Sequence, residues 1–263
     1  MLAMEIVNPR TGVRQFCEIK GQDGPGLALI HGWSANHRRF ERLHDLLAQQ
    51  FRTVSYDHRG HGLSEKKRDL DYSLGALVLD LLGVLDELGL ERPVLMGHSM
   101  GGIVALKFAR AFPERVRGLV LLGTAARVAH NDKERASMLR AAWMCRHAFS
   151  FVSLIKDKSK RAHPDIFTDI ADPRFAPQPA AVGMLLMSMA HLDIRDQLPH
   201  ISAPALAVGT PGDATMPFDL TQEMAGLLPD CRLTQIPDAT HHFITENPGQ
   251  TFDAVAGFIS QLM

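Results

Sequence analysis

The sequence predicts an α/β fold in which a mainly parallel sheet carries helices on both faces. Short apolar runs alternate with stretches of helical spacing along the chain, as in successive strand–helix–strand units. Some of these runs, such as residues 27–30, are apolar throughout, which is typical of strands that are buried on both faces. The length of 263 residues suits one large domain with room for an insertion.

Each element of this fold has its own local signal. Strands are expected at residues 27–30, 52–56, 93–96, 119–122, 204–209 and 231–236, and those at 27–30 and 204–209 are expected to be buried. Apolar positions three or four residues apart predict helices at 38–50, 74–88, directly after Ser99, 218–228 and 251–262. Gly89 is placed to end the second of these helices. Residues 1–20 are expected to form a β-hairpin.

The alternation stops between about residues 125 and 196, where helical patterns occur without a clear strand. We therefore expect two parts. Residues 1–124 and 197–263 form an α/β core, and residues 125–196 form a helical cap over one edge of the sheet.

The composition excludes several classes of protein. Hydrophobic residues make up 46% of the chain, and the net charge of −1 gives no global field for nucleic acid. The three cysteines, Cys17, Cys145 and Cys231, provide neither a disulfide framework nor zinc spacing, and no metal or other cofactor is expected. No secretory signal or apolar run of 18 residues is evident, so a cytoplasmic protein without membrane contact is expected.

A tight turn carries the strongest chemical signal. Gly97-His98-Ser99-Met100-Gly101 lies between an apolar run and a helix-forming stretch, which is the context of a nucleophile elbow. Side chains at the two glycines would collide with neighbouring backbone. The serine then stands at a helix N-terminus, whose unpaired N–H groups favour a developing oxyanion. An inert turn is the alternative, and the strand–turn–helix context favours a catalytic Ser99.

A serine nucleophile needs two N–H donors for the oxyanion, together with an acid and a base. One donor is the amide of Met100, the residue after the nucleophile. The other is the amide of Trp33, because the His31-Gly32-Trp33 loop follows an early strand. A plain β-turn is the alternative reading of this loop.

The acid and the base both have candidates near the C-terminus. Asp213 follows a buried strand, which places it at the same sheet edge as Ser99, although an aspartate in a Gly/Pro-rich loop is often only a turn former. His241 and His242 lie between the last strand and the last helix, where a base belongs. The chain order Ser, Asp, His agrees with these roles.

Other charged residues are expected to be structural. Asp57 and Arg59 follow a strand, and we expect them to fix their loop as an ion pair. Asp80, Asp86 and Glu87 are expected on the solvated face of a helix.

Together these motifs resemble the α/β-hydrolase superfamily over about residues 25–125 and 195–263. The resemblance rests on His31-Gly32-Trp33, Asp57-x-Arg59-Gly60-His61-Gly62-x-Ser64, Gly97-His98-Ser99-Met100-Gly101-Gly102, Phe112-Pro113-Glu114-Arg115-Val116, Asp213 and His241. It implies an eight-stranded, mostly parallel sheet with a helical cap after the sixth strand. It also implies that Ser99 attacks, His241 moves the proton, Asp213 orients His241, and Trp33 and Met100 hold the oxyanion.

The resemblance favours His241 over His242, because the distance from His241 to Pro248 matches the usual tail of the family. Thr240 departs from the pattern, since glycine commonly precedes the histidine. The activity implied is that of a cofactor-free serine carboxylesterase acting on small to medium acyl esters. A lactonase, a thioesterase or a C–C bond hydrolase would use the same residues, and a ligand receptor on the same fold is the non-enzyme alternative.

The cap segment carries a surplus of positive charge. Residues 125–165 contain nine Lys or Arg and four Asp or Glu. Such a run is usually a solvated helix face, and the alternative is a docking surface for an acidic partner. A basic cap and a His-Gly-Trp loop also resemble the pimeloyl-carrier-protein methyl esterases. That resemblance implies an acidic acyl carrier protein as a partner, in addition to a small-molecule ester substrate.

Overall fold

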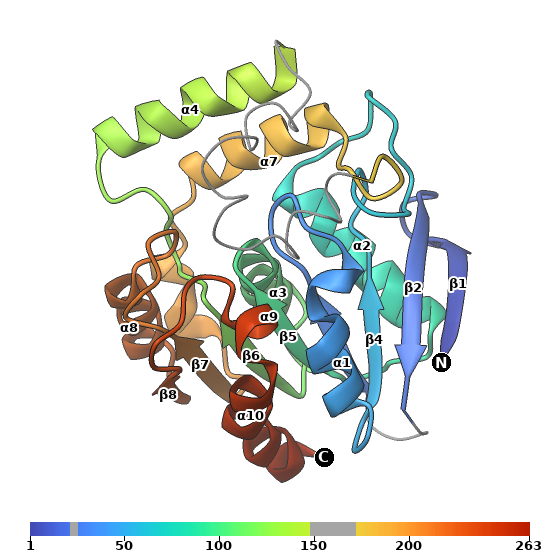
Figure 1. Ribbon diagram of the computed structural model, residues 1–263, viewed down its shortest axis with the longest axis vertical. Helices are drawn as coiled ribbons and strands as arrows, with labels where there is room; N and C mark the ends of the chain where they lie inside the picture. The colour runs from blue at the N-terminus through green and yellow to red at the C-terminus, as the bar shows by residue number, and fades with distance from the viewer. Residues whose placement is uncertain (22–25, 148–171) are drawn as a thin grey trace.

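The computed structural model describes residues 1–21, 26–147 and 172–263 and contains one twisted sheet of eight strands (Figure 1). The strand order is β1-β2-β4-β3-β5-β6-β7-β8. The bounds are β1 Leu2–Val7, β2 Arg14–Lys20, β3 Gly26–Ile30, β4 Arg52–Tyr56, β5 Val94–His98, β6 Gly118–Leu122, β7 Ala205–Gly209 and β8 Cys231–Gln235. Pairs β1–β2 and β2–β4 are antiparallel and the other pairs are parallel. The α/β fold, its mostly parallel sheet and the N-terminal hairpin are therefore confirmed.

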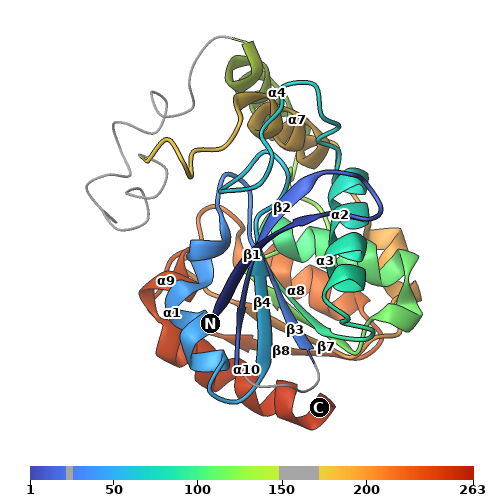
Figure 2. The same cartoon turned by 90° about the vertical axis from the view of Figure 1, so that its right-hand side faces the viewer.

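Helices cover both faces of this sheet, as Figure 2 shows. The helices α1 (Glu41–Leu47), α9 (Phe243–Glu246) and α10 (Pro248–Leu262) lie on one face. The helices α2 (Leu74–Glu87), α3 (Met100–Ala111) and α8 (Phe218–Leu227) lie on the other. Neighbouring strand residues point to opposite faces of the sheet. Leu27 and Leu29 therefore belong to the hydrophobic core under α1 and α10, while Ala28 and Ile30 belong to the core under α2 and α3.

The expected helix at 38–50 is two shorter elements, a 3₁₀ turn η1 (His37–Phe40) followed by α1. The side chain of Asn36 accepts a hydrogen bond from the Arg38 amide, and its main-chain carbonyl accepts one from the Arg39 amide. The second bond joins residues three positions apart, so the segment begins as a 3₁₀ turn. The closing helix begins at Pro248 rather than at residue 251, because proline suits the first helical position. The described residues also include the 3₁₀ turns η2 (Pro113–Arg115) and η3 (Arg195–His200).

In the described part of the segment between β6 and β7, the helices α4 (Asp132–His147) and α7 (Pro179–Ala190) pack on each other. Both lie beyond the carboxyl ends of the parallel strands (Figure 1). Their contact is close, since a Cβ added at Gly183 would lie 2.7 Å from the carbonyl oxygen of Ala142. Residues 148–171 lie outside the described residues, and so do many of the charges counted for the predicted basic surface.

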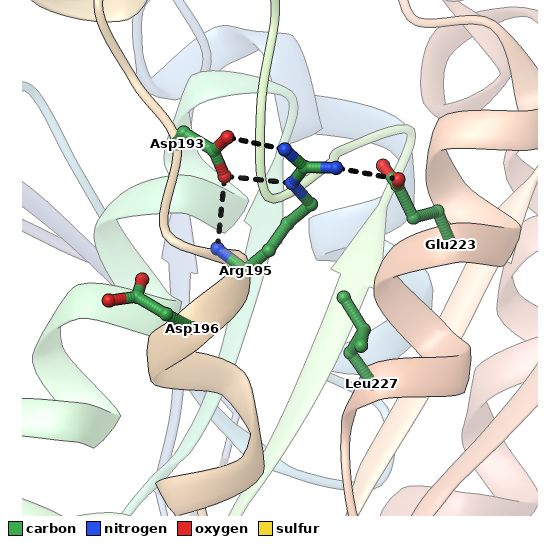
Figure 3. A pocket seen from close by; sticks show the side chains of 5 residues that line it. All are labelled: Asp193, Arg195, Asp196, Glu223 and Leu227. Atoms are coloured by element: carbon green, nitrogen blue, oxygen red, sulfur yellow. Dashed lines mark hydrogen bonds and ion pairs between the residues drawn. The ribbon is translucent and has the colours of Figure 1, made fainter.

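The two ends of this segment lie side by side at the base of α7. The amide of Ile194 donates to the carbonyl of Ala126. Glu223 of α8 bonds Arg127 at 2.9 Å and Arg195 at 3.2 Å, and Arg195 also pairs with Asp193. Asp193, Arg195 and Glu223 line an open hollow of about 540 Å³ together with Asp196 and Leu227 (Figure 3). These ion pairs join the start and the end of the segment to the core.

The expected ion pair between Asp57 and Arg59 is wrong. Asp57 accepts the main-chain and ring N–H groups of His37, at 2.6 and 2.9 Å, and the amide of Leu63 at 2.7 Å. Arg59 bonds Asp80 of α2 instead, at 2.6 and 2.7 Å. Asp80 was expected on a solvated face, but it is 0% exposed because the loop after β4 covers that side of the helix.

Replacement of Asp80 by alanine is expected to lower the free energy of unfolding by about 3–5 kcal/mol, because it leaves a buried guanidinium without its carboxylate. Arg59 is only 5% exposed. Asp86 of the same helix is the matched control, since its ion pairs with Arg10 and Arg115 are partly exposed. Its alanine variant is expected to lose at most about 1 kcal/mol. Urea unfolding measures both variants, and equal losses would contradict this account of Asp80.

Candidate active site

Ser99 stands at the sharp turn between β5 and α3. Its backbone angles are φ 55° and ψ −123°, a conformation that costs a non-glycine residue about 1–3 kcal/mol. The neighbouring structure holds this geometry in place. The Ser99 amide donates to the carbonyl of Leu122 in β6 at 2.8 Å, and the Ser99 carbonyl accepts the amide of Gly102 at 2.9 Å.

The two glycines of the elbow are required by close backbone contacts, as the sequence predicts. A Cβ at Gly97 would lie 2.3 Å from the carbonyl oxygen of Gly101. A Cβ at Gly101 would lie 2.0 Å from the carbonyl oxygen of Ile30, the last residue of β3. The first turn of α3 therefore lies directly against the end of β3, which brings the following loop beside Ser99.

That loop contains Trp33, one of the two residues predicted to donate an amide N–H to the oxyanion. A Cβ at Gly32 would lie 3.1 Å from the Cβ of Ser99, so the backbone next to Trp33 is adjacent to the serine. Met100 occupies the first position of α3, where an amide N–H has no carbonyl one turn earlier to bond. The amides of Trp33 and Met100 thus belong to the two chain segments that border Ser99.

The side chain of Trp33 reaches across to the segment between β6 and β7. Its Nε1 donates to the carbonyl of Val182 in α7 at 2.9 Å. A second bond runs from the amide of Gln178, just before α7, to the carbonyl of Gly60. Helix α7 is therefore fixed to the loops that follow β3 and β4.

A group of buried histidines packs against the loop after β3, which contains Gly32 and Trp33. The ring of His31 donates through Nδ1 to the carbonyl of Gly32 at 2.8 Å and accepts the amide of His58 through Nε2 at 3.0 Å. Burial lowers the pKa of His58 to about 3 and the pKa of His61 to about 4, and it lowers the pKa of His31 well below its usual value. With pKa values lowered in this way the rings are neutral at physiological pH. His31 and His58 hold the loop after β3 by hydrogen bonds, and His61 bonds the carbonyl of Arg59.

Asp213 and His241 form a buried pair at the same edge of the sheet. The Nδ1 of His241 lies 2.7 Å from Oδ2 of Asp213. The other carboxylate oxygen accepts the amides of Thr215 and Met216 at 2.8 and 2.7 Å. An ionised carboxylate only accepts, so Nδ1 of His241 carries a proton, and in the neutral ring Nε2 is the nitrogen with the free lone pair. Asp213 is 4% exposed and His241 is 7% exposed.

The turn after β6 connects this pair with the serine. Leu122 accepts the amide of Ser99, and Gly123 follows it with φ 52°. A Cβ at Gly123 would lie 3.5 Å from Oδ2 of Asp213 and 3.6 Å from Nδ1 of His241. The structure therefore brings Ser99, Asp213 and His241 together around one turn of the chain.

His242 takes a different place from its neighbour. It precedes α9, and its Nδ1 lies 3.4 Å from Nη1 of Arg39. Among the described residues, the histidine bonded to the Asp213 carboxylate is His241. The structure thus shows which of the two adjacent histidines contacts Asp213, a choice that the residues alone left open.

Sequence reasoning missed two contacts of this site. One is the bond from Trp33 to Val182, and the other is a bond from the ring of His98 to the main chain of His241. Both join residues more than 140 positions apart, and no local pattern in the sequence marks either one. Within residues 1–21, 26–147 and 172–263, no group of three or more His, Cys, Asp or Glu side chains could hold a metal ion.

The fold and this arrangement define a hydrolase of the α/β class. The chain belongs to the α/β-hydrolase fold family, whose sequence profile matches residues 25–248. In the described part of the chain, no helix has the length and apolarity needed to cross a membrane.

Individual relatives fall into two groups. An uncharacterised protein of Mycobacterium tuberculosis is 40% identical over 111 residues, which are 42% of this chain and 32% of that protein. The matched stretch thus spans about a third of that relative's length. A pimeloyl-[acyl-carrier protein] methyl ester esterase of Aeromonas hydrophila is 26% identical over 247 residues, which are 90% of this chain and 96% of that enzyme.

Among solved structures, a thermophilic esterase from Thermogutta terrifontis is similar over the whole fold. Its TM-score is 0.85 at 28% sequence identity, and the match covers 100% of this chain and 99% of that chain.

Proposed function

We propose that the protein is a serine carboxylesterase that hydrolyses small to medium acyl esters through an acyl-enzyme on Ser99. The observation that carries this proposal is the bond from His241 Nδ1 to Asp213, which leaves Nε2 basic at the sheet edge where Ser99 stands. The similarity to an esterase over the whole chain supports the choice of an ester substrate.

The reaction would begin with attack of Ser99 Oγ on the ester carbonyl carbon. His241 Nε2 takes the hydroxyl proton, and Asp213 stabilises the imidazolium that results. The carbonyl oxygen becomes an oxyanion, which the amides of Trp33 and Met100 stabilise by hydrogen bonds. When the intermediate collapses, the C–O bond to the alcohol breaks and His241 returns the proton to the leaving oxygen.

Water then completes the cycle. His241 takes a proton from the water as it attacks the acyl carbon, and Ser99 leaves with that proton. Each step moves one proton through His241 and consumes only ester and water, so the proposed chemistry calls for no bound cofactor.

The residues between the sixth and seventh strands would determine which esters enter. We propose that residues 125–196 form a cap, with α4 and α7 beyond the strand ends that carry the site. In α/β enzymes, a pocket between core and cap is shaped by such a segment rather than by the sheet.

The test is turnover of a panel of p-nitrophenyl esters from acetate to palmitate, with a lactone, a thioester, a C–C substrate and a methyl ester on an acidic acyl carrier protein beside it. The expected result is multiple turnover with an optimum at short or medium acyl length. Turnover restricted to the carrier-bound ester would instead favour the specialised esterase. Binding of ligands, seen as a rise in melting temperature without turnover, would contradict the proposal and favour a receptor.

A further inference from the structure

His98, the residue before Ser99, connects the elbow to the loop of His241. Its Nε2 lies 2.9 Å from the main-chain carbonyl oxygen of His241. A carbonyl oxygen only accepts, so Nε2 of His98 carries the proton and donates it. The two rings are also close, with their centres 4.9 Å apart.

We infer that His98 is a positioning residue for His241, an inference that rests on the proposed function of Ser99 and His241. His241 is then held at two points. Asp213 bonds the imidazole at Nδ1, and His98 bonds the main chain at the carbonyl. Two fixed points restrict both the rotation of the ring and the place of the residue that carries it.

The place of His98 in the sequence makes this bond effective. His98 and Ser99 are consecutive, so one rigid turn carries both the nucleophile and the donor that fixes the base. The separation between Ser99 Oγ and His241 Nε2 is therefore set by a direct bond from the elbow. Without that bond it would depend on the loop between β8 and α9 and on the bond from the imidazole to Asp213.

The surroundings of His98 indicate a specific role for this one bond. The residue is 3% exposed, and among the described residues its Nδ1 has no hydrogen-bond partner. Gly32 leaves no side chain on that side, since a Cβ there would lie 3.5 Å from Nδ1. The ring thus makes its one hydrogen bond to His241, at the energetic cost of a buried nitrogen without a partner.

Neutrality of His98 also suits this position. Burial, followed by the neighbouring His241, lowers the pKa of His98 well below its usual value. A neutral ring still donates through Nε2. It adds no second positive charge beside the imidazolium that forms on His241 during each proton transfer.

The test compares H98L, which has a similar volume and no donor, with H98Q, whose amide N–H reaches about as far as Nε2. In H98L, kcat is expected to fall by about 10- to 100-fold, as a displacement of about 1 Å does elsewhere, with KM changed by less than about threefold. In H98Q, kcat is expected to recover to within about fivefold of the wild type. H98M is a second variant without a donor, for use if H98L does not fold.

A second readout needs no turnover. The proton between His241 Nδ1 and Asp213 should give a far-downfield proton resonance. We expect this resonance to broaden or shift in H98L and to return in H98Q. Wild-type kcat in H98L, an equal loss of kcat in both variants, or an unchanged resonance would each overturn the inference. A wild-type protein without ester turnover would contradict the proposed function instead, and the resonance would still test the positioning role.

Discussion

Replacement of Ser99 by alanine is expected to lower kcat for the best ester of the panel by about 10⁶-fold, the loss typical of a removed nucleophile. In the proposed mechanism, the hydroxyl is the atom that bonds the acyl group. In the proposed function the cap and the oxyanion amides bind the substrate, so KM is expected to change little. Steady-state hydrolysis of p-nitrophenyl esters measures both quantities.

Ser34 provides a matched control for this variant. It is another buried serine with positive φ, at 57°, and its hydroxyl has no hydrogen-bond partner among the described residues. Alanine at residue 34 loses the same atom at another residue with positive φ, and kcat is expected to stay within about threefold of the wild type. Residual turnover in the Ser99 variant above about 1% of wild type would contradict the assigned nucleophile.

Replacement of His241 by alanine is expected to lower kcat by about 10⁴- to 10⁶-fold, because Ser99 then has no base to take its proton. Replacement of His242 is expected to cost less than about tenfold. His242 contacts Arg39, whereas His241 is the residue bonded to Asp213.

These two variants remove the same ring from adjacent positions, so each serves as the control for the other. Melting temperatures of both proteins identify any loss of folded material. A larger loss of kcat in the His242 variant would reverse the assignment of the base.

The strands and the elbow could be predicted because their signals are local. A short apolar run such as residues 119–122 is typical of a buried strand. The glycines around Ser99 indicate places where the backbone approaches too closely for a side chain. Asp213 and the histidine pair could be placed at one edge because each follows a parallel strand, and the carboxyl ends of such strands meet there.

The partners of individual side chains could not be predicted in the same way. The helical pattern of α2 defines an apolar stripe, but it does not reveal that the loop after β4 covers Asp80 on another side. Arg59 therefore had two carboxylates within plausible reach in the sequence, and the nearer one in the chain was the wrong choice. The contacts of His98 and Trp33 depend on how loops meet in space, which no periodicity encodes.

The choice between His241 and His242 shows most clearly what the sequence alone cannot predict. Both residues satisfy the position after the last strand, and only a family resemblance favoured one of them from the sequence. The 2.7 Å contact with Asp213 separates them, because the carboxylate bonds the ring of His241 while the ring of His242 lies beside Arg39.

The central claim is that Ser99 carries the acyl group during the reaction, and mass spectrometry of acid-quenched protein tests it most directly. The protein is mixed with a p-nitrophenyl ester for milliseconds, quenched and digested. The account predicts that the peptide containing Ser99 gains the mass of the acyl group minus one hydrogen, and that this adduct disappears in the Ser99→Ala variant. Ester turnover with the acyl group on another residue, or with no adduct on Ser99 even after deacylation is slowed, would contradict it.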